Sequence, residues 1–253
     1  MTKLERFKQK HPVCCFCAGE RPTESLDHQP PRVFFKNKRF PDQIAVPACK
    51  LCQSASREAE NVLSLAVIGA EPSEFDVDNW RKRYESVRRR TPHLLPRTPK
   101  NTREARALLG ELGTRPPPGM LYSEVPIFTL DTEAWAPLFE MLGRKLCLAF
   151  HYRCFRKPLT CQGRGFARVF TNAAEMPDLS DIFHQLPQLE IGTHGSEDLG
   201  DQISTRWHAN ETGRLFLFMT RLQSQLFVVG GSGETEQWRQ FVDRFGGGFP
   251  PFD

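Results

Sequence analysis

The sequence has no apolar run that approaches the roughly 20 consecutive residues a membrane-spanning helix needs. It also lacks a secretory signal, because the basic side chains among residues 1–10 are not followed by an apolar stretch. Internal repeats and low-complexity tracts are missing as well. We therefore expect a cytoplasmic protein that has no membrane partner and no repeat architecture.

A large excess of charge of one sign is also missing. The 34 lysines and arginines nearly balance the 30 acidic residues, which leaves a net charge of +4 over 253 residues. With 39% hydrophobic residues, this is the composition of a globular chain of one generous domain or two modest ones. Eight cysteines are present, but disulfides are rare in the cytoplasm. The cysteines therefore favour a metal site.

The chain divides into three regions. Residues 1–72 contain every paired cysteine, residues 73–118 are basic and helical, and residues 119–253 have no paired cysteine. Consecutive prolines in segment 114–119 favour extended backbone and mark the second boundary. We predict an α+β protein in which a basic helical connector joins an N-terminal zinc-bound module to an α+β domain with a mainly antiparallel sheet.

Two Cys-x-x-Cys pairs form the strongest motif. Structural zinc takes four ligands in a tetrahedron, and each pair offers two thiolates from one tight turn. Gly19, just after the first pair, suits such a turn. Four unrelated buried cysteines are the alternative, since free cysteine often behaves as a small apolar residue. The spacing favours a structural zinc ion, and its four ligands would be Cys14, Cys17, Cys49 and Cys52.

The segment between the pairs reads Asp-His-Gln-Pro-Pro-Arg over residues 27–32. Residues 27–35 are predicted to be extended because a residue before proline avoids helical geometry, and a helix is predicted over residues 54–68. The order of Cys-x-x-Cys, Asp-His-x-Pro-Pro, Val-Pro-x-Cys-x-x-Cys and helix resembles the HNH, or ββα-metal, endonucleases. The similar subgroup joins its hairpin to its helix through a four-cysteine zinc site. The resemblance covers about residues 11–70.

This resemblance implies roles for individual residues. The family's histidine before the prolines is the general base, here His28, and the preceding acidic residue helps to hold a catalytic divalent ion, here Asp27. The family's third residue, usually Asn or His, follows the last cysteine; here it is Gln53, whose amide oxygen can bind Mg²⁺ or Mn²⁺ from one methylene further out. Arg32 is a candidate phosphate contact. Alternative metal ligands on the same helix are Ser54, Ser56, Glu58 and Glu60.

These side chains suit the hydrolysis of a phosphodiester. A histidine can take a proton from water near neutral pH, and a divalent cation can neutralise the charge that develops on the phosphate. The zinc ion would fix hairpin to helix in a motif too small to be rigid alone. We expect a metal-dependent endonuclease acting on DNA, with RNA as the alternative substrate. The rival interpretation is an inactive nucleic-acid-binding or protein-adaptor module. A third possibility is a toxin or phage-defence effector whose C-terminal domain senses a trigger.

A basic cluster follows the zinc module, within a helix predicted over residues 76–90. Few acidic residues offset it, and Trp80 and Tyr84 share one helix face. A phosphate backbone attracts such a cluster, and arginine binds phosphate in bidentate fashion, although a solvated helix face is the common alternative. The candidate nucleic-acid contacts are Arg81, Lys82, Arg83, Arg88, Arg89 and Arg90.

The C-terminal region carries no chemical motif. Helices are predicted over residues 132–152, where large apolar residues share one face, and over residues 234–241. Strands are predicted over residues 167–171, 188–191, 203–208, 215–220 and 226–229. Residues 246–251 are expected to form a flexible tail. A protein partner or a homo-oligomer can use this domain, and the sequence does not choose between them.

Overall fold

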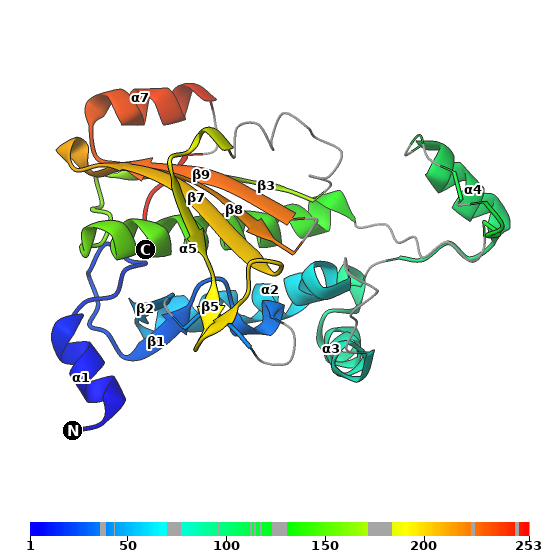
Figure 1. Ribbon diagram of the computed structural model, residues 1–253, viewed down its shortest axis with the longest axis horizontal. Coiled ribbons are helices and arrows are strands. Elements are labelled where there is room, and N and C mark those ends of the chain that lie inside the picture. Colours follow the sequence, from blue (N-terminus) through cyan, green and yellow to red (C-terminus); the bar gives the residue numbers. More distant parts are fainter. Residues whose placement is uncertain are drawn as a thin grey trace.

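The computed structural model describes residues 1–35, 39–42, 44–69, 77–95, 97–111, 113, 115–116, 118–122, 131–171, 184–223, 226–245 and 248–252. Helices and antiparallel sheet are combined in layers (Figure 1). One long helix, α5 (Thr132–Phe155), lies in the middle. A six-stranded sheet covers one side of α5, and α7 (Glu236–Phe245) lies on the far face of that sheet. A short hairpin and its following helix cover the other side of α5.

The large sheet is antiparallel, with strand order β10-β3-β9-β8-β7-β4. All five predicted strands are confirmed, although several run longer than predicted. A small two-stranded sheet of β5 (Thr193–His194) and β6 (Glu197–Asp198) was not predicted. The large sheet consists of β3 (Arg164–Phe170), β4 (Gln188–Ile191), β7 (Ile203–Asn210), β8 (Leu215–Leu222), β9 (Leu226–Gly233) and β10 (Gly248–Phe249).

The prediction of a flexible tail over residues 246–251 is wrong for the residues that the structure describes. Gly248 and Phe249 form β10, which pairs with β3 at the edge of the sheet. The Phe249 ring occupies the space that a Cβ atom on Gly165 would need. The glycine on β3 therefore makes room for an aromatic side chain from the tail, and composition alone gives no sign of this contact.

Helix α5 is surrounded by protein along its middle turns. It begins where Asp131 accepts a hydrogen bond from the Ala134 amide (3.2 Å) and ends at Arg156, which has a left-handed backbone (φ 56°). Every residue from Lys145 to Tyr152 is buried, as expected of a helix that packs on all sides. The helix contacts β3 and β9 on one side, and α2 and β2 on the other. The predicted helix over 132–152 is confirmed and extends to Phe155.

A β-hairpin and a helix form the second layer. Strand β1 (Ser25–His28) pairs with β2 (Ala45–Ala48), and α2 (Lys50–Gly69) follows directly. The helix starts about one turn before the predicted start at residue 54. The prediction of an extended segment over 27–35 holds only at its start, because η1 (Arg32–Phe34) is a 3₁₀ turn that buries Phe34. Helix α1 (Lys3–Lys10), which precedes the hairpin, was not predicted.

Helix α3 (Val77–Arg90) packs against α2 and confirms the predicted helix over the described part of 76–90. The region continues through η4 (Pro92–Leu94) and α4 (Thr102–Glu111). Near the other end of the chain, α7 runs to Phe245, further than the predicted 234–241. It begins after Thr235, whose hydroxyl accepts a hydrogen bond from the Trp238 amide (3.2 Å).

The apolar core joins the first and last regions of the sequence. One cluster combines residues of α2, α3, α5 and the large sheet. A second cluster places the paired cysteines against Leu148, Ala149 and Tyr152 of α5 and against Leu159. The boundaries at 72/73 and 118/119 stay predictions. Described residues of the first and third regions belong to both clusters, whereas those of the connector belong to the first cluster alone.

Candidate functional site

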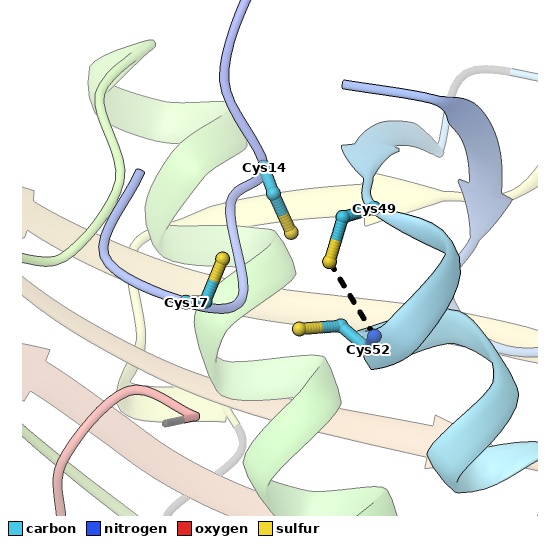
Figure 2. A group of neighbouring side chains, drawn as sticks. All are labelled: Cys14, Cys17, Cys49 and Cys52. Atoms are coloured by element: carbon cyan, nitrogen blue, oxygen red, sulfur yellow. Dashed lines mark hydrogen bonds between the residues drawn. The ribbon is translucent and has the colours of Figure 1, made fainter. Parts of the chain in front are cut away.

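The four paired cysteines converge on one point. Cys14 and Cys17 come from the loop after α1, and Cys49 and Cys52 stand at the start of α2 (Figure 2). All four are buried, and their sulfur atoms lie within 4.8 Å of one another. A zinc–sulfur distance of about 2.3 Å in a tetrahedron separates the sulfurs by about 3.8 Å. The cluster can therefore hold a zinc ion.

The backbone explains why this short loop can present two thiols. Ala18 and Gly19 have left-handed backbone (φ 51° and 82°) and reverse the chain after the first pair. The Phe16 and Cys52 amides donate to the sulfur atoms of Cys14 and Cys49, each at 3.4 Å. Such bonds favour the thiolate form that binds metal.

The charges of the four thiols support a cation at their centre. A hydrogen bond from the Cys52 thiol, the largest influence, lowers the pKa of Cys14 to about 5. Burial and then the Cys14 charge raise the pKa of Cys17 to about 11. The hydrogen bond with Cys14 and burial also raise the pKa of Cys52. The negative charge on Cys14 thus raises the pKa of Cys17 and of Cys52, and a dication among the sulfur atoms would offset that charge.

A cleft of about 740 Å³ lies beside the cysteine cluster, between the end of β1, η1 and the first turns of α2. The hairpin register places His28 opposite Ala45, at the end of the two strands where the connecting segment begins and ends. Asp27, His28 and Arg32, which are close together in the sequence, line this cleft together with the more distant Gln53. The other lining residues are Leu26, Pro31, Val33, Lys50, Leu51, Ser54, Arg57 and Glu60.

His28 is half-buried at the edge of the cleft. Its Nε2 atom contacts the Arg32 guanidinium, and its Nδ1 atom is buried without a hydrogen-bond partner among the described residues. Phe40 packs edge-on against the imidazole at 4.9 Å and under the Arg32 guanidinium at 4.3 Å. Burial and then the charge of Arg32 lower the pKa of His28 to about 4. The imidazole is therefore neutral at pH 7.

Asp27 is bound by a buried lysine that the sequence analysis did not single out. The ammonium of Lys145 on α5 donates to Asp27 Oδ2 (2.6 Å), Glu60 Oε1 (2.8 Å) and Ser56 Oγ (2.7 Å). The Gln29 amide also donates to Asp27 Oδ2 (3.2 Å). Burial opposes the charge of Lys145, but the carboxylates of Asp27 and Glu60 outweigh it and raise its pKa. The lysine therefore stays charged and ties hairpin, α2 and α5 together.

Gln53 faces the hairpin. Its Oε1 atom accepts a hydrogen bond from Ser25 Oγ (2.9 Å), and its Nε2 atom donates to the Leu26 carbonyl (3.3 Å). The amide that was predicted to bind a divalent ion thus joins α2 to β1. A metal ion at Gln53 would have to replace the bond from Ser25.

The structure separates the alternative ligands on α2. Glu60 lines the cleft and shares the Lys145 ammonium with Asp27, and burial raises the pKa of its carboxyl. Ser56 is buried and bonded to the same ammonium. Glu58 lies outside the cleft, in a neighbouring hollow between α2 and α3. Ser54 also lines the cleft, and Glu60 is the alternative carboxylate that shares both the cleft and the Lys145 ammonium with Asp27.

The six predicted basic contacts do not share one environment. Arg81, Lys82, Arg89 and Arg90 line a hollow of about 430 Å³ on α3. Arg88 is ion-paired with Glu85 (2.7 Å). Arg83 donates to the Val33 carbonyl, so it joins α3 to η1.

Lys145, Lys50 and Arg57 belong to this region and were missed from the sequence. Lys145 had a usable signal, because it is a charged residue inside a run of buried apolar residues on α5. Lys50 and Arg57 had none beyond their place on α2, since exposed basic residues on helices are common.

Comparison of the chain with protein-family models, curated proteins and solved structures finds no match. Among the residues that the structure describes, no helix combines the length and apolar character needed to span a bilayer.

Proposed function

We propose that this protein is a metal-dependent endonuclease of the HNH type that hydrolyses phosphodiester bonds in DNA. The observation that carries the proposal is the placement of His28, Asp27 and Arg32 in one cleft, on a β-hairpin that a four-cysteine cluster joins to its helix. A zinc ion in this cluster would hold hairpin and helix in fixed orientation and would not touch the substrate.

His28 is the general base in this proposal. A base must reach the attacking water with an unprotonated nitrogen, and Nε2 of His28 is the atom that Arg32 contacts in the structure. Phosphate is the preferred partner of a guanidinium. A phosphate in the cleft would draw Arg32 away from His28, which frees Nε2 to accept the proton from water. Arg32 would then bind the substrate and uncover the base in one movement.

The cleft offers oxygen ligands for a divalent ion, but the carboxylates among them are bound by Lys145 in the structure. When bound, Mg²⁺ or Mn²⁺ would supply the positive charge that stabilises the phosphate during hydrolysis. Asp27 and Glu60 offer carboxylates at the cleft, and such oxygen ligands suit these ions. Both hydrogen bonds to Asp27 end on Oδ2. We therefore propose Asp27 and Glu60 as the ligands, with Gln53 as the ligand that the family resemblance implies.

A second function has one observation in its favour. The Gln53 amide is bonded to Ser25 and Leu26, and Asp27 is bonded to Lys145. If these hydrogen bonds persist, Gln53 and Asp27 do not bind a catalytic ion. The zinc-bound hairpin would then bind nucleic acid or a protein without cleaving it. This alternative makes the opposite prediction for plasmid cleavage.

The test is nicking of supercoiled plasmid by the zinc-loaded protein with Mg²⁺ or Mn²⁺. We expect cleavage by the wild type and a loss of about 10²- to 10⁴-fold in the His28→Ala variant, because a general base contributes about that much. His208→Ala is the matched control, since His208 is exposed on β7, and it should cleave normally. A plasmid that stays intact with the wild type, or equal rates for His28→Ala and wild type, would refute the proposal.

A further inference from the structure

We infer that a continuous basic groove leads from the His28 cleft to the outer face of α3 and binds the backbone of double-stranded nucleic acid without reading its sequence. The inference deepens the proposed function and rests on it for the cleavage site at one end of the groove. Binding along the groove needs no catalysis, so it is tested separately.

Three hollows share their walls. Next to the cleft lies a hollow of about 190 Å³ between α2 and α3, and beyond it lies the hollow of about 430 Å³ on α3. Ser54 and Arg57 line both the cleft and the middle hollow. Ser86 and Arg90 line both the middle and the outer hollow. Because they share these residues, the three hollows adjoin one another in a row, with an arginine at each junction, and we infer that they act as one groove.

The charges along the groove favour a polyanion. Arg32 contacts His28, and Lys50 lies 3.8 Å from Glu24. The other exposed basic residues of the groove have no hydrogen-bond or ion-pair partner in the described part of the chain. Of the acidic lining residues, Asp27 and Glu60 are paired with Lys145 and Glu85 with Arg88. Glu58 in the middle hollow has no such partner in the described part of the chain, so one exposed carboxylate stands against five exposed cations. A concave surface with unneutralised cations attracts phosphates and releases their counterions. The cations without such a partner are Arg57, Arg81, Lys82, Arg89 and Arg90.

The groove lacks the second element of a single-strand binding site. Proteins that bind single strands combine a basic groove with aromatic side chains on which bases stack. Among the residues that the structure describes, those that line the three hollows include no Phe, Tyr or Trp. Trp80 and Tyr84 of α3 stack on each other (5.1 Å) and pack against the core. Recognition through phosphates alone fits a duplex, whose bases are already stacked.

The experiment measures binding in the absence of cleavage. The His28→Ala protein, with no divalent ion added to the buffer, is titrated against two fluorescent DNA duplexes of unrelated sequence and against the single strands of each. The test variant adds Arg57→Glu and Arg90→Glu, which reverse the two junction residues. The matched control adds Lys10→Glu and Arg244→Glu, an equal charge change at exposed positions on α1 and α7. A milder variant, Arg57→Gln with Arg90→Gln, guards against misfolding.

We expect the junction variant to bind both duplexes about tenfold more weakly or worse. Its slope of log affinity against log salt should flatten by about two, because each lost phosphate contact removes about one from that slope. The glutamine variant should show the same change in slope. The control should stay within about twofold of the parent. Equal weakening in the control, an unchanged slope in both junction variants, or tighter binding to single strands than to duplexes would overturn the inference.

Discussion

The Lys145 ammonium lies 2.6 Å from the Asp27 carboxylate, and it joins a helix of the C-terminal half to the strand that carries His28. Only 1% of the Lys145 side chain is exposed. Asp27 and Glu60 are its carboxylate partners, and each of them lines the cleft. The geometry of the cleft thus depends on a residue outside the motif that resembles the HNH family.

Replacing Lys145 with methionine should destabilise the protein strongly. The change leaves two carboxylates without their cation, and breaking a buried pair in this way costs about 3 kcal/mol or more in the free energy of unfolding. Urea unfolding measures the loss. Lys157→Met, at an exposed position, should change stability by no more than about 0.5 kcal/mol. Adding Asp27→Asn to Lys145→Met should recover part of the loss, and strict additivity of the two changes would contradict the pairing.

Elemental analysis of the purified protein should find about one zinc per chain. Cys49→Ser should lower the zinc content and make the hairpin sensitive to protease, because the ion joins β2 and α2 to the loop of Cys14. Cys161→Ser is the control, since Cys161 is exposed outside the cluster, and it should keep its zinc. Zinc-free wild-type protein that is fully folded would exclude the metal assignment.

Glu60 and Glu58 form a matched pair on α2 for testing the catalytic ion. If Glu60 is a ligand, Glu60→Gln should raise the Mn²⁺ concentration for half-maximal cleavage by about tenfold or more. Glu58→Gln, outside the cleft, should leave it unchanged. Gln53→Ala tests the residue that the family resemblance implies. A tenfold effect of Gln53→Ala with none for Glu60→Gln would assign the ion to Gln53 instead.

The free energy of unfolding should decrease as the pH is lowered, because of a second histidine. His151 is buried on α5, and its Nδ1 atom is hydrogen-bonded to Ser232 Oγ (2.8 Å). Burial, reinforced by Arg214 and opposed by Glu234, lowers the pKa of His151 to about 4. Between the unfolded pKa of about 6.5 and this value, the unfolded chain binds more protons than the native one, so acid favours unfolding.

From pH 7 to pH 5 this imbalance should cost the wild type about 2 kcal/mol in the free energy of unfolding. The His151→Gln variant has no imidazole to protonate. Between pH 7 and pH 5 its free energy of unfolding should therefore fall by about 2 kcal/mol less than that of the wild type, whatever its stability at pH 7. His208→Gln, at an exposed position, should follow the wild type. Parallel stability curves for His151→Gln and the wild type would exclude His151 as the source.

The sequence was most informative where spacing alone decides the structure. Cys-x-x-Cys presents two thiols from one turn, so the two pairs predicted a common site, and five strands of the large sheet were predicted from short segments bounded by turn residues. Spacing says nothing about which distant groups pair. The bond between Lys145 and Asp27 spans 118 residues, and the placement of Gln53 depends on Ser25 in the facing strand. Such contacts are decided by packing, which a single sequence does not reveal.

The basic cluster shows the same limit. Arg83 and Arg88 look equivalent to Arg89 and Arg90 in the sequence, but Arg83 is bonded to a carbonyl of η1 and Arg88 to Glu85. Arg57 lies outside the basic cluster in the sequence, but in the structure it lines the same hollow as Arg90. The density of basic residues in the sequence predicts that this surface is positively charged. Which of these residues line the groove depends on how α2 and α3 pack.

The long sequence separation between Asp27 and Lys145 has a consequence during synthesis. A ribosome adds about 5 to 20 residues per second, so the 118 residues between them take roughly 6 to 24 s to translate. During that interval the Asp27 carboxylate of the nascent hairpin has no ammonium partner, and the Glu60 carboxylate of α2 lacks it over the last 85 residues. A protein assembled in this order stays incomplete while it is being made, and it gains a finished cleft only when α5 has left the ribosome.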